Sequence, residues 1–143
     1  MPRIYRTMKR ADDGLPVVEA TARGLGVRVP PDKRSDIDID GAGNVILNGR
    51  GMSVAEHWRH IFPGMIPARL DDGHNGARGS NELHCWRMGE GPFVVGPLAD
   101  KLELIMKEYA RKSGLVVPSG PMPVQAFQDA LAATRGQWIE DES

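Results

Sequence analysis

Short runs of alternating apolar and polar residues, separated by glycine and proline, make up most of the chain. In residues 3–7 this alternation places Ile4 and Arg6 on one face of a strand and Tyr5 on the other, which predicts a first β-strand. Further apolar runs bounded by turn residues predict strands at residues 17–20, 27–29, 44–47, 82–88, 91–96 and 114–118. The runs at 82–88 and 91–96 are close enough in sequence to form a hairpin.

Helical spacing without a competing strand pattern appears in two places. Val54, Trp58 and Ile61 recur at helical intervals before Pro63, which predicts one or two helical turns. After two prolines that suit a first helical turn, the clearest predicted helix has one apolar face that packs on a sheet, made of Val124, Phe127, Leu131, Thr134 and Trp138.

Three other segments complete the pattern. Residues 98–114 fit a helix by spacing, although Leu102, Leu104 and Met106 also fit one face of a strand. Residues 70–81 are polar and glycine-rich, which predicts a surface loop. The acidic tail, residues 139–143, is expected to be frayed.

Composition limits the architecture to one small domain, residues 1–143, with a core of its own. The 17 glycines and 11 prolines divide the chain into brief segments and argue against a helical bundle. Eighteen Lys and Arg against 19 Asp and Glu give a net charge of −1, so we expect neither nucleic acid nor a membrane surface as a partner. The single cysteine excludes an internal disulfide and suits a reducing compartment.

The N-terminal residues lack the apolar core of a secretory signal, and no apolar run is long enough to span a bilayer. A protein made in the cytoplasm is therefore expected. Export would need a route that does not use such a signal.

Two metal sites are conceivable from the sequence, and both are weak. Residues 36–41 resemble the start of a calcium loop, but the position that needs a bidentate Glu is Leu47. The alternative is a solvated approach to a turn at residues 40–44. A zinc site would need His57, His60, His74, His84 or Cys85, yet no second cysteine and no H-E-x-x-H motif support it. We expect no metal.

Two polar residues have both a structural and a functional interpretation. Ser53 follows two glycines and precedes a predicted helical turn, so it is either a helix N-cap or a hydroxyl that contacts a ligand. Arg6 either extends along the sheet edge to solvent or reaches a phosphate inside a cleft. The residues alone do not separate these alternatives.

Three blocks of sequence resemble a known family. They are "IYR" near the start, "DIDIDGAGNVILNGRGMSV" in the middle and "VVPSGPMPVQAFQDALAATRGQW" near the end. Together they are similar to the small ADP-ribosyltransferase-like toxins first known as bacterial type VI secretion effectors. The glycine-serine core and the closing helix are the most specific parts. The resemblance implies an α+β fold with two small antiparallel sheets, a few short helices and a C-terminal helix, and an NAD-binding cleft between the sheets. It also implies that residues 100–106 form a strand that leads to residues 114–118.

The chemistry that the resemblance implies is cleavage of the nicotinamide glycosidic bond of NAD, used as a substrate, through an oxocarbenium-like transition state. ADP-ribose would pass to a target or to water. Such a site needs a cation, an apolar or aromatic wall, a hydroxyl and usually a carboxylate. Arg6 and Ser53 match the motif and are the expected catalytic residues. Tyr5, Arg6, Ser53 and His57 are the expected NAD-binding residues, with His60 as an alternative to His57.

The resemblance does not identify the expected carboxylate, because no Glu lies in a recognisable motif. Glu103 and Glu82 are candidates by position alone, and solvated strand residues are their simpler interpretation. Met52 stands where some relatives have a threonine, so a second hydroxyl is absent as well. The leading hypothesis is an NAD-dependent toxin that acts in the cytoplasm of a target cell and has a neutralising immunity protein. The alternative is a non-catalytic binding protein that keeps the fold.

Overall fold

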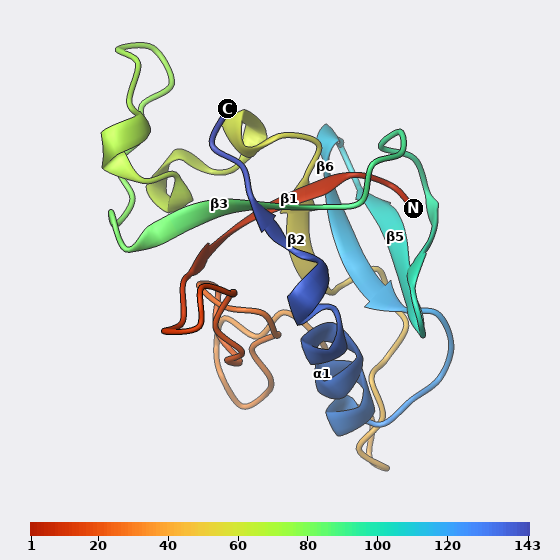
Figure 1. Cartoon of the computed structure of the whole chain (residues 1–143). Coiled ribbons are helices and arrows are strands. Elements are labelled where there is room, and N and C mark those ends of the chain that lie inside the picture. The colour runs from red at the N-terminus through yellow and green to blue at the C-terminus, as the bar shows by residue number, and fades with distance from the viewer.

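A computed structural model describes all residues, 1–143, and shows one curled, antiparallel sheet of seven strands with a single α-helix (Figure 1). The strands lie in the order β4-β5-β6-β2-β1-β3-β7. Their bounds are β1 (Ile4–Lys9), β2 (Met52–Ala55), β3 (Leu83–Met88), β4 (Gly96–Ala99), β5 (Leu102–Lys107), β6 (Ala110–Pro118) and β7 (Ile139–Glu140). The helix is α1 (Val124–Ala133), and single 3-10 turns are η1 (Trp58–His60), η2 (Pro63–Met65), η3 (Ala68–Leu70) and η4 (Arg135–Gln137).

The expectation of two separate sheets needs correction, because every strand belongs to one sheet. The join between its halves is nevertheless slight. β1 pairs with β3 along all six of its residues, whereas β1 pairs with β2 only at Tyr5 and Ala55. Beyond that pair the two central strands diverge, so the sheet is partly divided at its middle.

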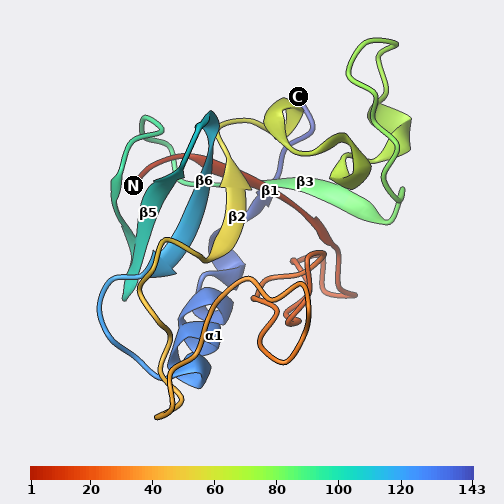
Figure 2. The same cartoon turned by 180° about the vertical axis from the view of Figure 1, so that it is seen from behind.

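Helix α1 lies against one face of the sheet, as the sequence predicts, and Figure 2 shows it below the ends of β2 and β6. Phe127 and Leu131 of α1 are buried in the same apolar cluster as Ile4 of β1 and Met52 of β2. The helix ends at Ala133, earlier than its apolar face suggests. Trp138 still joins the core from beyond the helix end, where its indole N–H donates to Thr134 Oγ1 at 2.9 Å.

The opposite face carries a smaller cluster, in which Tyr5, Trp58, Ile66, Ala77 and Cys85 pack together beneath the long connection from β2 to β3. This connection includes the predicted surface loop at 70–81, most of which is exposed and has no strand or long helix. Both faces of β1 are therefore buried, which explains why a short strand can hold the centre of the molecule.

The predicted strands at residues 3–7, 82–88 and 114–118 are confirmed as β1, β3 and part of β6. Those at 17–20 and 27–29 lie outside the strands, and of 91–96 only Gly96 belongs to one, β4, so the predicted hairpin at 82–96 does not form. Residues 44–47 make only isolated bridges, because the Val45 N–H bonds to Met122 O while Ile46 and Leu47 turn outward and are exposed. A local apolar run predicts burial but does not supply a partner strand.

Two segments with helical spacing contribute strands instead of helices. Residues 102–107 form β5, in hairpin with β6, as the family resemblance implies and against the helical spacing. The predicted helical turns after residue 53 are wrong in their first part, because Val54 lies in β2 and only Trp58–His60 form a 3-10 turn. Pairing of β2 with β6 at four positions outweighs the weak helical spacing of these residues.

The expected frayed tail is in fact ordered against the sheet. Residues of β7 pair with β3, and the Asp141 N–H bonds to Cys85 O at 2.8 Å. The Asp141 carboxylate accepts hydrogen bonds from the Tyr5 hydroxyl at 2.8 Å and from Arg87 Nε at 3.0 Å. Acidic residues at a chain end suggested solvation, but here they meet partners from β1 and β3. None of the helices has the length and apolar character needed to cross a membrane.

Acid should weaken this attachment of the tail. Hydrogen bonds from Ser143, Tyr5 and Arg87 hold the pKa of Asp141 well below its usual range. Because the folded-state pKa is depressed, the contribution of Asp141 to stability is complete above the unfolded pKa of about 3.9 and is lost as the pH falls through the folded value. We expect Asp141→Asn to lower the free energy of unfolding by about 1 kcal/mol at pH 7, a small value because surface ion pairs are screened.

Urea unfolding of both proteins at pH 7 and pH 3 checks this expectation. The difference between native and variant should shrink at pH 3. An equal difference at both pH values would show that the carboxylate charge contributes nothing.

Candidate functional site

A partly enclosed cavity of about 220 Å³ opens where β1 and β2 diverge. Arg6 from β1 and Ser53 from β2 line it, and so does Asp36 from the long connection between these strands. Ile61 and Phe62, from the connection between β2 and β3, supply an apolar side. Segments distant in sequence thus meet at the division of the sheet, where backbone pairing is interrupted and leaves room for side chains.

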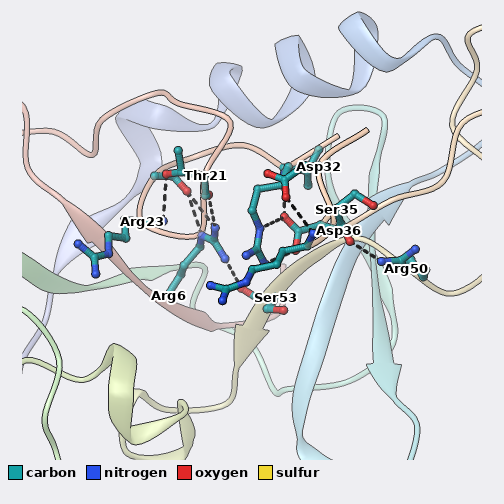
Figure 3. A network of polar contacts seen from close by, with 12 residues as sticks. Arg6, Thr21, Arg23, Asp32, Ser35, Asp36, Arg50 and Ser53 are labelled. Atoms are coloured by element: carbon teal, nitrogen blue, oxygen red, sulfur yellow. Dashed lines mark hydrogen bonds and ion pairs between the residues drawn. The ribbon is translucent and has the colours of Figure 1, made fainter. Parts of the chain in front are cut away.

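The Arg6 side chain fills part of the gap between the strands. It is only 7% exposed, and it donates to three backbone carbonyls: Gly24 O from Nε at 3.1 Å and from Nη2 at 3.0 Å, Thr21 O from Nη2 at 3.3 Å, and Ser53 O from Nη1 at 2.8 Å (Figure 3). Four of the five N–H groups of the guanidinium are therefore engaged. Arg6 is neither at the sheet edge nor extended to solvent.

No carboxylate is hydrogen-bonded to Arg6, although the cation is buried. Burial lowers its pKa to about 10, and the charge of Asp36 partly offsets that effect. A buried cation without a bonded counter-ion attracts anions, because a low-dielectric wall strengthens its field. One wall of the cavity therefore carries the positive charge of Arg6, even though four of the guanidinium N–H groups already donate to backbone carbonyls.

Ser53 is exposed and faces the cavity from the middle of β2, so it is not a helix N-cap. Its carbonyl accepts from Arg6, while its hydroxyl has no hydrogen-bond partner in the chain. The preceding Gly51 allows β2 to lie close to β6, because a Cβ there would be 2.2 Å from Val116 O. The glycine-serine core of the sequence thus has a structural reason for its glycine and leaves the serine available.

Tyr5 and His57 have mainly structural contacts. Tyr5 borders the cavity, but its hydroxyl is bonded to Asp141. His57 lies against the Tyr5 ring at 4.8 Å between centroids, caps η1 through Nδ1, and does not line the cavity. Burial lowers the pKa of His57, which favours its neutral form. The alternative histidine, His60, does line the cavity.

Asp36 is the only carboxylate among the residues that line the cavity, and sequence reasoning did not select it. Its oxygens accept from Arg28 Nη2 at 2.8 Å, from Arg28 Nε at 3.1 Å and from the Arg28 N–H at 2.8 Å. Neither Glu82 nor Glu103 borders the cavity. The signal for Asp36 lay in the acidic run that begins the middle block, but it was interpreted as a turn approach or a metal loop.

The acidic run is divided among different partners. Asp38 accepts from Arg50 and Asn48, and Asp40 accepts from the backbone N–H groups of Ala42 and Asn44. These contacts argue against the calcium hypothesis, because the aspartate carboxylates bind different partners and do not converge on one point. No three His, Cys, Asp or Glu side chains lie in an arrangement that could hold a metal ion.

Comparisons of the chain with protein-family models, with curated proteins and with solved structures find no match.

Proposed function

We propose that the protein is an NAD-dependent toxin of the ADP-ribosyltransferase type, which acts in the cytoplasm of a target cell. The observation that carries this proposal is the meeting of Arg6, Ser53 and Asp36 in one cavity at the division of the sheet. The first two are the residues expected from the sequence resemblance. The third supplies the carboxylate that the resemblance lacked. The partial division between β1 and β2 supports an ADP-ribosyltransferase-like arrangement despite the single sheet.

The proposed reaction breaks the bond between C1′ of ribose and the nicotinamide nitrogen. The bonding electron pair stays on nicotinamide, which leaves as a neutral molecule, and positive charge develops on the ribose. The Asp36 carboxylate faces the cavity and would stabilise that charge, because a fixed opposite charge acts strongly in a site with little water. An acceptor hydroxyl, or water, then forms the new bond to C1′ and releases its proton to solvent.

The remaining residues position the substrate. The Ser53 hydroxyl would bond the ribose or the carboxamide, and the apolar surface of Ile61 and Phe62 would contact the nicotinamide ring. Arg6 would act mainly by its charge, since four of its donors hold the backbone around the cavity. An immunity protein that covers the mouth of this cavity would neutralise the toxin.

A second candidate function is a non-catalytic protein that binds a ligand in the same cavity. The observation in its favour is that Asp36 is already held by three hydrogen bonds from Arg28, and Arg6 by backbone carbonyls. A site so engaged could hold a ligand without cleaving it. The two functions differ in whether NAD is consumed.

Expression in a bacterial host tests the proposal. We expect the native chain to arrest growth and deplete cellular NAD, and Ser53→Ala to relieve both effects. Ser119→Ala is the matched control, because Ser119 is an exposed serine that lines neither this cavity nor the groove beside it. Normal growth with unchanged NAD and unchanged protein ADP-ribosylation, at equal levels of folded protein, would contradict the enzymatic proposal and favour the binding protein.

A further inference from the structure

An open groove adjoins the cavity, between the connection from β1 to β2 and the turn of the β5–β6 hairpin. The two hollows share Arg28, Asp36, Ser53 and Lys107, so their contents would be in contact. The groove has a volume of about 730 Å³. That size lies within the roughly 300–1,000 Å³ of typical small-molecule sites. Of the residues that line the groove, only Ser53 is expected from the sequence to contact a ligand.

The groove has a positive charge that the chain as a whole lacks. Five cationic residues line it, against the two carboxylates of Asp36 and Glu108; the cations are Arg28, Lys33, Arg34, Arg50 and Lys107. This is an excess of three positive charges in a chain whose net charge is −1. An excess gathered in one concave surface attracts anionic ligands locally.

Not all of these cations are free to meet a ligand. Arg28 is paired with Asp36, and Arg50 with Asp38 and the Ser35 carbonyl (Figure 3). Lys33, Arg34 and Lys107 are exposed and have no ion-pair partner in the chain. The two paired arginines therefore form part of the groove wall, and the three cations without an ion-pair partner remain to bind anionic groups.

An exposed aromatic residue completes the groove. Tyr109, at the turn between β5 and β6, is 98% exposed and has a φ of 61°. This backbone conformation costs a residue with a side chain roughly 1–2 kcal/mol, and Tyr109 recovers none of that cost through burial. The fold therefore supplies no reason for a tyrosine at this position. A ring that lines the same groove as the cations offers a stacking surface for a planar base.

We propose that the groove binds a nucleoside diphosphate group, with its phosphates at Lys33, Arg34 and Lys107 and its base against Tyr109. This inference rests on the proposed function only where it names NAD as the source of that group. The nicotinamide end of NAD would then lie in the cavity. A free nucleotide has the same chemistry. Single-stranded nucleic acid is less suited, because the groove leads into a cavity of small volume and the chain has no net positive charge.

Titration calorimetry of the purified full chain with ADP, ADP-ribose, inorganic pyrophosphate and an eight-nucleotide single-stranded DNA tests the proposal. We expect ADP and ADP-ribose to bind, and the double variant Lys33→Ala with Arg34→Ala to weaken binding at least tenfold. Tyr109→Ala should weaken ADP about tenfold and leave pyrophosphate unchanged, since stacking contributes about 1–3 kcal/mol per base. Tighter binding of ADP-ribose than of ADP would identify the dinucleotide as the source, and equal binding would identify a free nucleotide.

The matched control removes the same two charges elsewhere, by Arg23→Ala with Lys101→Ala, because both residues are exposed and lie outside the groove. Its affinity for ADP should equal that of the native chain. No ADP binding, equal losses in both double variants, or tighter binding of DNA than of ADP would overturn the proposal. ADP binding without NAD cleavage would instead overturn only the proposed function, and NAD cleavage without ADP binding only the groove.

Discussion

We expect Arg6→Met to lower the free energy of unfolding by about 3–5 kcal/mol, among the largest effects of any single substitution in this chain. Methionine has a similar length but no donors, so the carbonyls of Gly24, Thr21 and Ser53 would lose their partner. A buried acceptor left without a hydrogen bond costs about 1–3 kcal/mol. Removing the desolvated charge recovers some of this cost, which is why the expected value is less than the sum over three carbonyls.

The matched control is Arg10→Met, one residue beyond the end of the same strand. Arg10 is largely exposed and pairs with Glu140 at the surface, so its loss should cost less than about 1 kcal/mol. Urea unfolding of both variants measures the difference. If Arg6→Met were as stable as Arg10→Met, Arg6 would not join β1 to β2, and its guanidinium would be free for a ligand.

The largest expected effect on activity is that of Asp36→Asn, which should lower kcat for nicotinamide release from NAD by about 10²–10³-fold, as is typical for loss of one preorganised electrostatic group. Asparagine keeps the shape and can still accept a hydrogen bond from Arg28, but it lacks the charge that would stabilise the ribose cation in the proposed reaction. Because Asp36 in the proposed reaction would act on charge that develops in the transition state, KM should change much less than kcat.

Asp38→Asn serves as the control, since Asp38 also pairs with an arginine in the same segment but does not line the cavity. It should retain nearly native kcat. A native kcat for Asp36→Asn, together with a large loss for Glu108→Gln, would assign the carboxylate to Glu108 in the adjacent groove. Thermal unfolding of each variant separates a catalytic loss from a loss of folded protein.

Elements with strong local patterns could be predicted from the sequence. The strands around Tyr5 and Val116, and the helix around Phe127, have apolar residues at the spacing their packing requires. Segments that owe their form to distant partners could not be predicted in the same way. The residues of β2 show helical spacing but pair with β6, and Val45 is buried without belonging to a strand.

Some residues of the candidate site could likewise be predicted from the sequence, and others could not. Arg6 and Ser53 were selected because they match a motif, and both line the cavity, although Arg6 is engaged with the backbone to an extent that no sequence pattern indicates. Asp36 could not be selected, because its place at the cavity depends on a long connection without regular structure. Nothing in the sequence marks Tyr109 as a ligand-binding residue. Its full exposure and its left-handed backbone conformation make it unusual, and both are visible only in the structure.

We propose that NAD is cleaved in the cavity between β1 and β2. The most direct test of this proposal is the release of nicotinamide from NAD by the purified chain, followed by liquid chromatography with and without a cell lysate that supplies acceptors. We expect release in proportion to the amount of protein, and its loss in Ser53→Ala. Intact NAD after prolonged incubation with folded protein, in both conditions, would contradict it.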